Sequence, residues 1–283
     1  MNTGPLVSAQ WLESHLDEVR VIDSRWYLDG RSGHAAYLGG HIPGAVWVDL
    51  DRELSGPATR EAGRHPLPTP DAFAAAMTRL GIGDNTPVVV YDDAGGSIAA
   101  RLWWMLHMLD HDVAVLDGDI RAWTGPRTTD DVTVAPVPFR PRPWPAARIV
   151  DADAVDVLRT DTNALVLDAR AAARYAQGDP TIDPRPGHIP AARSAPWADN
   201  VDPATGRVRA AADLRQRFAA LGATDAEAIV AYCGSGVTAC HNMLALTIAG
   251  FGDRIALYPG SWSQWGADED RPTQTGPDDA AVT

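Results

Sequence analysis

The sequence contains the same pattern twice, and this internal repeat constrains the fold more than any other feature. Four segments recur in the same order: VRVIDSRW (19–26) as ALVLDARA (164–171), GHIPGA (40–45) as GHIPAA (187–192), PVVVYDD (87–93) as AIVAYCG (228–234), and AVLDGDIRAW (114–123) as ALYPGSWSQW (256–265). The offset between matching segments stays between about 141 and 147 residues. A constant offset over four ordered matches indicates a duplicated domain.

The repeated segments include short, uninterrupted runs of β-branched residues, which are typical of strands buried on both faces of a parallel sheet. Helical patterns separate these runs. TPDAFAAAMTRLGI (69–82) begins with an N-cap threonine and a proline and ends at Gly81, and AADLRQRFAALGA (211–223) is its counterpart ending at Gly222. Strands that alternate with helices predict the α/β class, here two tandem doubly wound domains, each a parallel sheet flanked by helices.

Proline and acidic residues mark the predicted boundaries. The stretch 135–146 has five prolines in twelve residues and is expected to form an extended linker. The predicted domains are therefore residues 1–134 and 147–272. Residues 273–283 form an acidic tail with almost no large apolar residue, and we expect this tail to be mobile.

Composition excludes several classes of function. The net charge is -13, and all 24 cationic residues are arginine. Schiff-base catalysis and a P-loop both need lysine, and nucleic-acid binding needs a basic surface. The two cysteines do not make a disulfide scaffold, and we find no signal peptide and no apolar run long enough for a membrane span. We expect a cytoplasmic protein with no nucleic-acid or membrane partner.

The repeat also serves as an internal control, because features shared by both halves belong to the fold. His41 and His188 both lie in Gly-His-Ile-Pro and are expected to be structural turn residues. The pairs Asp23/Arg25 and Asp168/Arg170 also match, and we expect each pair to form a structural network at the end of the first strand of its half.

Features found in one half alone are candidates for function. Cys233 stands where the first half has Asp92, and Arg174 stands where it has Ala36. Cys233 ends a predicted strand, which is where ligands bind in open parallel sheets. Most lone cysteines are structural, but here a glycine loop leads into a helix predicted to start near Val237. Backbone N–H groups and the helix dipole would stabilise a thiolate there, so we predict a reactive nucleophile.

These motifs closely resemble the two-domain rhodanese superfamily of sulfurtransferases. The resemblance runs from Leu6 to about Pro272 and includes both GHIP turns, GRHPLP (63–68), the Cys233 loop and LYPGSWSQW (257–265). The N-terminal half is catalytically silent in that family, which agrees with Asp92 at the position of the cysteine.

The resemblance implies a donor. Thiosulfate sulfurtransferases carry cations after the cysteine, whereas this loop, Cys-Gly-Ser-Gly-Val-Thr, matches 3-mercaptopyruvate sulfurtransferases. Thiosulfate remains the alternative donor. Arg174 matches an arginine that binds the donor carboxylate; for a second one, the simplest spacing gives Asp183, and Arg185 is the nearest candidate. The loop residues expected at the substrate are Gly234, Gly236, Val237 and Thr238.

The resemblance also implies a serine-histidine-aspartate set, here Ser235, His65 and Asp51. His65 has no repeat partner, and its alternative role is a contact between domains. The implied mechanism forms a Cys233 persulfide, releases pyruvate, and passes the sulfur to a thiol such as reduced thioredoxin or to cyanide. It needs no cofactor and no metal.

Three other interpretations are weaker. A cysteine phosphatase would need an arginine six residues after the cysteine, where this chain has Ala239, and its loop would have to be larger. A non-catalytic sulfur- or redox-binding module would not need the intact second loop. His107 and His111 are four residues apart on a predicted helix, but with no third ligand nearby we interpret them as ordinary helix residues, and Cys240 likewise.

Overall fold

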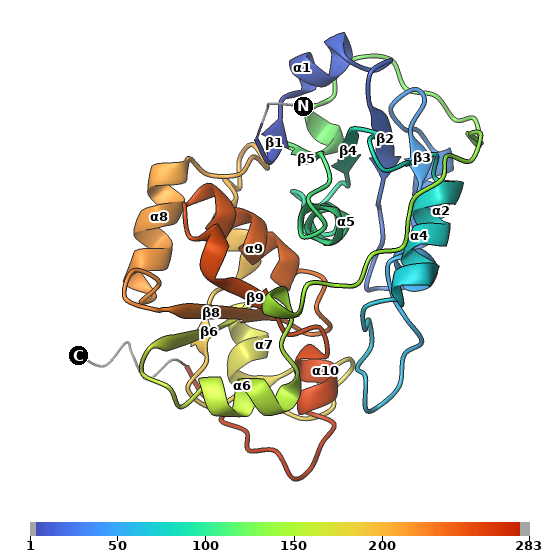
Figure 1. The fold of residues 1–283 in the computed structure, drawn as a ribbon. Coiled ribbons are helices and arrows are strands. Elements are labelled where there is room, and N and C mark those ends of the chain that lie inside the picture. The colour runs from blue at the N-terminus through green and yellow to red at the C-terminus, as the bar shows by residue number, and fades with distance from the viewer. Residues whose placement is uncertain (1–3, 278–283) are drawn as a thin grey trace. The chain divides into compact units, whose positions relative to one another are not determined.

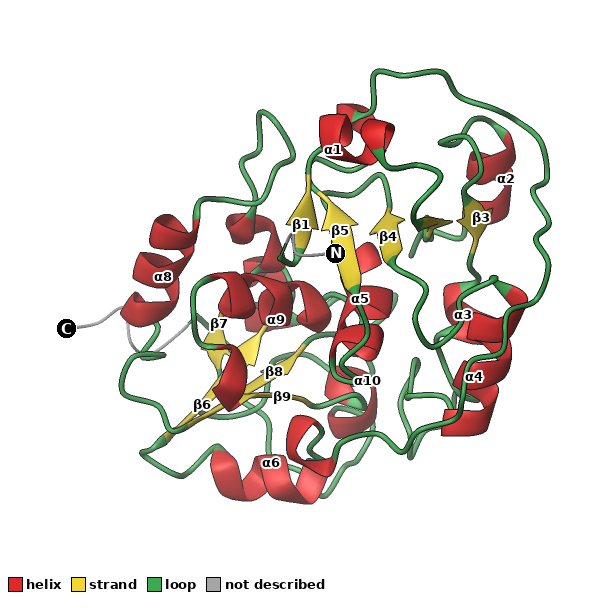
Figure 2. Ribbon diagram, turned by 45° about the horizontal axis from the view of Figure 1, so that its top comes forward, coloured by secondary structure: helices red, strands yellow, loops and turns green. Residues whose placement is uncertain are grey.

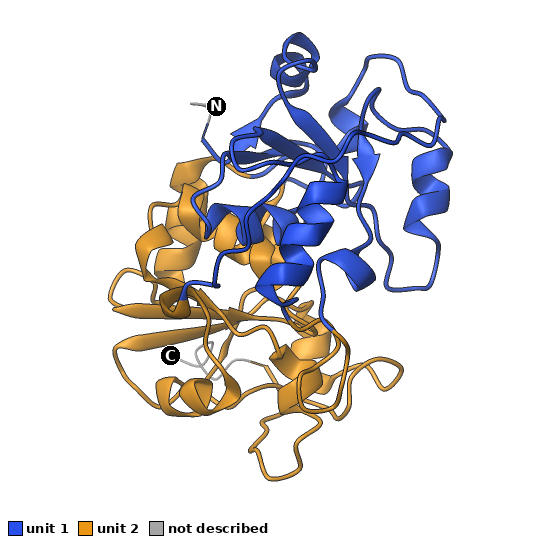
Figure 3. Ribbon diagram, turned by 45° about the vertical axis from the view of Figure 1, so that its right-hand side comes forward, with its two compact units in different colours: residues 1–56, 67–145, 202–208 blue, residues 57–66, 146–201, 209–283 orange. Residues whose placement is uncertain are grey.

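The structure is a computed structural model that describes residues 4–277. The chain divides into two compact units (Figure 3). Unit 1 comprises Met1–Gly56, Leu67–Pro145 and Asp202–Val208, and unit 2 comprises Pro57–Pro66, Ala146–Val201 and Arg209–Thr283. The main break lies at the end of the proline-rich stretch. The assignment of 57–66 to unit 2 matters for the site, because this segment carries His65.

Unit 1 contains a five-stranded parallel sheet in the order β1-β5-β4-β2-β3 (Figure 1). The central strands are the predicted apolar runs, and β4 is buried on both faces. The edge strands β1 and β3 have two residues each, and β1 was not predicted. The strands are β1 (Leu6–Val7), β2 (Arg20–Asp23), β3 (Val46–Trp47), β4 (Val88–Tyr91) and β5 (Val113–Leu116).

Apart from α5, the helices of unit 1 begin at residues whose side chains cap them. The Thr69 side chain accepts a hydrogen bond from Ala72 N (3.2 Å), and Pro70 is the first helical residue, which confirms the predicted start of α4. Ser8 caps α1 in the same way. The helices are α1 (Ala9–Ser14), α2 (Gly33–Leu38), α3 (Leu50–Glu53), α4 (Pro70–Arg79), α5 (Ala99–His107) and the 3-10 turn η1 (Ile120–Ala122).

Unit 2 repeats this topology with four parallel strands in the order β7-β6-β8-β9. Ile149 forms a parallel bridge to Leu257 and occupies the position that β1 has in unit 1. The two-residue edge strand β7 was not predicted from the sequence. The strands are β6 (Ala164–Asp168), β7 (Arg193–Ser194), β8 (Ala228–Tyr232) and β9 (Ile255–Leu257).

Helices cover both faces of the unit 2 sheet, with α8 and α9 on one side and α6 and α7 on the other (Figures 1 and 2). The α/β class and the duplication are thereby confirmed. Helix α9 begins at Ala239, two residues later than predicted. The helices are α6 (Ala152–Leu158), α7 (Ala172–Gln177), α8 (Ala211–Ala220), α9 (Ala239–Ile248), α10 (Ser261–Trp265) and the 3-10 turns η2 (Ala146–Arg148), η3 (Trp197–Asn200) and η4 (Gly252–Arg254).

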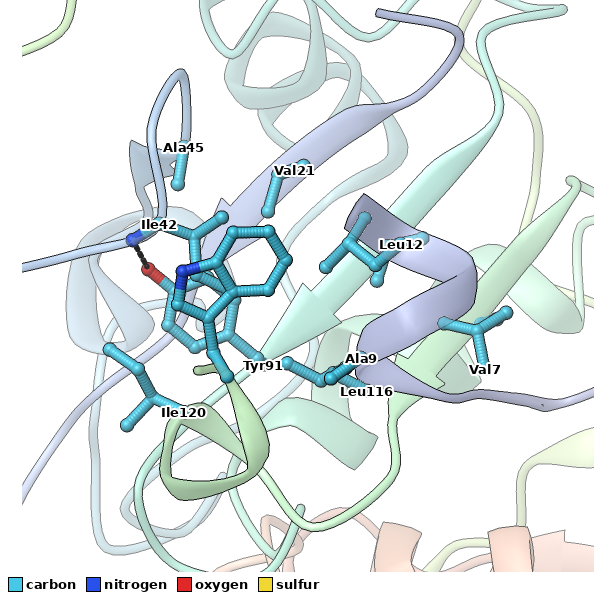
Figure 4. Close-up of a cluster of buried hydrophobic side chains, with 12 residues drawn as sticks. Val7, Ala9, Leu12, Val21, Ile42, Ala45, Tyr91, Leu116 and Ile120 are labelled. Atoms are coloured by element: carbon cyan, nitrogen blue, oxygen red, sulfur yellow. Dashed lines mark hydrogen bonds between the residues drawn. The ribbon is translucent and has the colours of Figure 1, made fainter. Parts of the chain in front are cut away.

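Each unit has its own apolar core. Alternate residues of a strand point to the same face of the sheet, so each face can pack against the elements that cover it. In unit 1, alternate residues of β4 pack with α1, and the Tyr91 hydroxyl accepts a hydrogen bond from Ile42 N (Figure 4). In unit 2, Tyr232 makes the equivalent bond with Ile189 N and packs with Trp262. Burying a large apolar side chain contributes about 1.5–3 kcal/mol, so these cores fix the strands that carry the loops.

The structural network predicted at the end of the first strand is present in both units. Arg25 forms an ion pair with Asp23 and donates to the Gly40 carbonyl, and Arg170 does the same with Asp168 and Gly187. Burial acts to lower the pKa of Arg170, but the ion pair and hydrogen bonds with Asp168 outweigh it and raise that pKa. These pairs anchor the turns of the GHIP motifs.

The two GHIP histidines make the same contacts in both units, which agrees with the expected role as structural turn residues. His41 Nδ1 lies 2.9 Å from the Tyr37 carbonyl oxygen, and its ring stacks on the Tyr37 ring. His188 makes the same pair of contacts with Tyr175.

The predicted tail lies partly outside the described residues, which end at 277. Within the described part, Gln274 exchanges backbone hydrogen bonds with His188, and Gly276 N donates to the Ala176 carbonyl. No helix in residues 4–277 is long and apolar enough to cross a membrane.

Candidate active site

The loop after β8 places Cys233 at the carboxyl end of the unit 2 sheet. Cys233 N donates to Ser261 Oγ (3.2 Å), and the Cys233 and Gly234 carbonyls accept from Trp262 N and Ser263 N (2.9 Å each). These bonds join the loop to the first turn of α10. The loop backbone is therefore held on both sides of the cysteine.

The Cys233 sulfur accepts a hydrogen bond from a backbone donor of its own loop. Gly236 N donates to Cys233 Sγ at 3.1 Å, and only 2% of Cys233 is exposed. Gly236 has φ +78°, and a β-carbon there would lie 2.6 Å from the Pro259 carbonyl oxygen. Glycine is thus required for the turn that aims this N–H at the sulfur.

The matching loop of unit 1 shows what such a loop binds. The buried Asp92 carboxylate accepts hydrogen bonds of 2.8–3.0 Å from four backbone N–H groups, those of Ala94, Gly96, Ile98 and Ala99. The loop of the first half therefore binds a carboxyl group of its own chain, whose pKa burial raises. In unit 2 the corresponding side chain is a thiol, which becomes an anion only when it ionises.

His65 and Ser235 form a buried pair within unit 2. His65 Nδ1 and Ser235 Oγ lie 2.7 Å apart, and the two residues are 3% and 6% exposed. Ser235 follows Cys233 by two residues, so a proton-transferring group is available next to the sulfur. The structure brings these two predicted residues together although 170 residues separate them in sequence.

Asp51 belongs to unit 1, where α3 carries it. Its Oδ2 accepts a hydrogen bond from Trp26 Nε1 at 2.9 Å. Because His65 and Ser235 belong to unit 2, the membership of Asp51 in their set stays a prediction.

Arg174 extends from α7 toward the cysteine loop and pairs with Asp183. Its Nε donates to Asp183 Oδ2 at 3.1 Å, and a second bond joins its Nη2 to Oδ1. Asp183 also accepts from Asp179 N and lies 3.6 Å from Arg170 Nη1. The residue at the position expected for a second arginine is therefore a buried carboxylate that orients the first.

Arg185 contacts the backbone instead. Its Nη2 donates to the carbonyls of Trp265, Asp268 and Arg271 at 3.2, 2.6 and 2.7 Å. These bonds tie the segment after α7 to the turn after α10. Its binding of a substrate carboxylate stays a prediction.

Sequence reasoning missed Arg64, which lies beside Cys233. Burial lowers the pKa of Arg64, while the nearby Cys233 acts to raise it. Arg64 Nη1 donates to the Ile182 carbonyl at 3.0 Å. A β-carbon built on Gly234 would lie 3.0 Å from Arg174 Nη2 and 3.2 Å from Arg64 Nη2, so both guanidinium groups reach the loop. The available signal was an arginine directly before His65.

Val237 and Thr238 complete the loop before α9. Val237 is buried, and Thr238 is half-buried and directly precedes α9. Cys240 is buried in α9, where its Sγ lies 3.3 Å from the Gly236 carbonyl oxygen. Cys240 thus contacts the loop backbone from α9.

A cavity of about 460 Å³ opens next to these groups. It is lined from the 57–66 segment, the 182–184 segment and α10, and its lining includes Arg60, Arg64, Asp183 and Ser263. Its volume lies within the range of small-molecule sites, and Cys233 is not among the residues that line it. Among residues 4–277, no group of three or more His, Cys, Asp or Glu side chains is arranged to hold a metal ion.

The family model that matches this chain is the rhodanese-like domain, and it matches twice, at residues 8–126 and 151–268. The chain belongs to the rhodanese-like family. The two matches coincide with the duplicated topology. The second contains Cys233 and the whole of its loop.

Relatives along the full chain support this assignment. A probable 3-mercaptopyruvate sulfurtransferase of Pseudomonas aeruginosa is 41% identical over 98% of this chain and 100% of its own length. A putative thiosulfate sulfurtransferase of Mycobacterium tuberculosis, SseB, is 34% identical over 92% of both chains. The crystal structure of SseA from Escherichia coli, described as a 3-mercaptopyruvate sulfotransferase, superposes with a TM-score of 0.80 at 32% identity, over 92% of this chain and 99% of that one. These rhodanese-like proteins share both halves of the chain.

Proposed function

We propose that this chain, a two-domain sulfurtransferase, takes sulfur from 3-mercaptopyruvate and passes it to a thiol acceptor through a persulfide on Cys233. The observation that carries the proposal is the loop itself. Gly236 N–H faces Cys233 Sγ, the loop from Cys233 to Thr238 has no cation, and the Arg174 guanidinium lies over Gly234. One sulfur nucleophile and a carboxylate-binding arginine suit an α-keto acid that carries a thiol.

In the first step the Cys233 thiolate attacks the sulfur of the donor. A sulfur–sulfur bond forms, the carbon–sulfur bond breaks, and its electron pair leaves as the enolate of pyruvate. The enolate carbon then takes up a proton, which gives pyruvate. The His65–Ser235 pair is positioned to accept the proton of the donor thiol and to return one to the enolate. His65 Nδ1 and Ser235 Oγ are already 2.7 Å apart, which allows a proton to pass between them.

In the second step an acceptor thiolate attacks the outer sulfur of the persulfide, and Cys233 leaves as the thiolate. A dithiol acceptor then closes its own disulfide and releases hydrosulfide. A reduced protein dithiol of the thioredoxin type fits this requirement, and cyanide replaces it in an assay. Such an acceptor and two free cysteines in this chain suit a reducing cytoplasm.

Thiosulfate is the second candidate donor, and one observation favours it. Two guanidinium groups, those of Arg64 and Arg174, lie near Gly234 and could bind a dianion. Against this, Asp183 neutralises Arg174. The carboxylate of 3-mercaptopyruvate needs less positive charge, so it remains the preferred donor.

The test is thiocyanate formation from cyanide with each donor in turn. We expect 3-mercaptopyruvate to be used with a much higher kcat/KM than thiosulfate. Cys233→Ser should abolish transfer from both donors, and Cys240→Ser, the matched control, should retain it. A preference for thiosulfate would overturn the choice of donor. Full activity of Cys233→Ser would overturn the persulfide mechanism.

A further inference from the structure

We propose that Ser263 is a positioning residue, which holds the 57–66 segment so that His65 meets Ser235. This inference rests on the proposed function, because it concerns the proton-transferring pair of that mechanism. Ser263 is the third residue of α10, and Arg121 stands at the matching position of the first half. The serine is therefore a feature of one half alone, as Cys233 is.

Ser263 joins the cysteine loop to the segment that carries His65. Its backbone N–H donates to the Gly234 carbonyl at 2.9 Å, and its Oγ accepts from Arg64 N at 2.9 Å. Gly234 directly follows Cys233, and Arg64 directly precedes His65. One residue of α10 thus links the backbone beside the nucleophile to the backbone beside the imidazole.

The Ser263 hydroxyl is oriented for this contact. Its Oγ donates to the Gly260 carbonyl at 3.0 Å, which leaves its lone pairs for the Arg64 N–H. Gly63 allows the close approach, because it has φ +86° and a β-carbon there would lie 2.6 Å from the Gly260 carbonyl oxygen and 2.9 Å from Ser263 Oγ. The chain therefore has a glycine where the 57–66 segment meets α10.

Other bonds hold the tip of the 57–66 segment, four or five residues before His65. They run from Arg60 to the Ala267 carbonyl and from Gln264 to the Glu61 carbonyl. The bond to Ser263 holds the residue next to the imidazole. It is therefore the contact whose loss most directly changes where His65 lies.

The separation of His65 and Ser235 depends on how their two segments are held. Their reacting atoms are 2.7 Å apart, although the residues are 170 positions apart in the sequence. Without Ser263 Oγ, the Arg64 N–H would lack this acceptor and the segment would move to find another. A displacement of about 1 Å can lower a rate by about 10²-fold, so proton transfer should slow while Cys233 stays in place.

The kinetic test follows pyruvate release in a single turnover at saturating 3-mercaptopyruvate. We expect Ser263→Ala to lower this rate at least tenfold and to leave KM within about threefold of the parent value. Ser263→Thr keeps the hydroxyl and should restore most of the rate. Ser263 also lines the 460 Å³ cavity. A higher KM with an unchanged rate would show that the hydroxyl binds the donor instead, and would overturn the proposal.

Ser14→Ala is the matched control for the loss of a hydroxyl. The Ser14 side chain is exposed and donates to the Gln10 carbonyl within α1 of unit 1. We expect the single-turnover rate to stay within twofold of the parent value. A loss equal to that of Ser263→Ala would contradict the proposal.

A double-mutant cycle tests whether Ser263 acts through the pair. In a Ser235→Ala background the hydroxyl that His65 faces is already absent. We therefore expect Ser263→Ala to lower the rate by less than twofold further, although it lowers the parent rate at least tenfold. Losses that multiply would show that Ser263 acts independently of Ser235, and would overturn its role as a positioning residue.

Gly63→Ala disturbs the same contact from the other side. Its β-carbon meets the backbone before α10 and should displace the segment, so we expect the single-turnover rate per folded molecule to fall at least tenfold. Gly222→Ala is the control, because Gly222 also has a positive φ, +96°, but a β-carbon there meets nothing within 4 Å. Its rate per folded molecule should not change. Equal rates in the two variants would contradict the proposal.

Hydrogen exchange tests the contact without turnover. In Ser263→Ala we expect the amides of residues 57–66 to exchange at least tenfold faster, while those of β8 keep their protection. Unchanged exchange in 57–66 would overturn the role of Ser263. Faster exchange in a chain whose parent releases no pyruvate from 3-mercaptopyruvate would support the contact and contradict the proposed function.

Discussion

Gly234 and Gly236 of the Cys233 loop are glycine for different physical reasons. Alanine substitutions at the two positions distinguish these reasons. Gly236 has φ +78° and faces the Pro259 backbone at 2.6 Å, whereas Gly234 faces only the tips of two flexible arginines. Gly236→Ala should destabilise the chain by about 1–3 kcal/mol and reduce kcat at least 100-fold, because the donor to Cys233 Sγ is displaced. Thermal unfolding and steady-state kinetics measure the two effects.

Gly234→Ala is the counterpart in the same loop. Its methyl group displaces the Arg64 and Arg174 tips without meeting backbone, so the melting temperature should stay within about 2 °C of the parent value. KM for 3-mercaptopyruvate should rise several-fold. A loss of stability equal to that of Gly236→Ala would contradict the distinction.

Ser235→Ala tests the pair with His65 at the residue scale. Removal of the hydroxyl leaves Cys233 in place but takes away the group 2.7 Å from the imidazole. We expect kcat for 3-mercaptopyruvate to fall by about 10²-fold or more. Persulfide formation in a single turnover should slow by the same factor. If only the transfer of sulfur from the persulfide to cyanide slowed, the His65–Ser235 pair would not be the group that accepts the proton of the donor thiol.

At this scale the repeat pointed to some candidate site residues and did not point to others. Cys233 and Arg174 stood out because the first half has Asp92 and Ala36 in their places. Arg64 was missed because its segment has no counterpart to compare with. The position of Arg64 also depends on how the chain divides into units: residues 57–66 belong to unit 2, while the residues on either side belong to unit 1. No local sequence pattern indicates that residues 57–66 belong to unit 2.

At the scale of elements, the buried ion pair at the end of β6 anchors the turn of the second GHIP motif. Asp168 is fully buried, and Arg170 is 2% exposed and donates to the Gly187 carbonyl. Asp168→Ala leaves the buried arginine with only the carboxylate of Asp183, 3.6 Å from its Nη1, and should cost about 3–5 kcal/mol. Denaturant unfolding measures the change. Asp29→Ala, which breaks an exposed pair with Arg31, is the control and should have no measurable effect.

Asp92 stabilises the start of α5 in unit 1. Asp92→Ala leaves four N–H groups without their acceptor, so we expect a loss of about 3 kcal/mol or more in the free energy of unfolding. Sulfur transfer per folded molecule should be unchanged, because Cys233 belongs to the other unit. Asp93→Ala removes one bond, from the Tyr27 hydroxyl, and should cost less. Equal costs would contradict the role given to Asp92.

Apolar runs and caps predicted the elements well, because burial on both sheet faces and a threonine–proline start leave clear patterns. The two-residue strands β1 and β7 gave no such pattern. Their pairing is decided by the neighbouring strands, β5 and β6, and not by their own residues. Helix α9 starts late because Val237 and Thr238 remain in the loop.

For the whole molecule, we predict one reactive sulfur site per chain. After treatment with 3-mercaptopyruvate and no acceptor, intact-mass analysis should show the addition of one sulfur atom, and peptide mapping should place it on Cys233. Cys240 is fully buried, with its sulfur facing the Gly236 carbonyl, and should stay unmodified. Sulfur on Cys240 in the Cys233→Ser variant would contradict this assignment.

The Asp92 carboxyl group in unit 1 has one more consequence. During turnover the outer sulfur of a persulfide on Cys233 would need backbone donors for a short time, and then lose them when the acceptor arrives. Asp92 holds the matching position permanently, with two oxygens and four donors. If the proposed persulfide is held in the same way, one copy of the duplicated loop keeps permanently an arrangement that the other copy would adopt only during turnover.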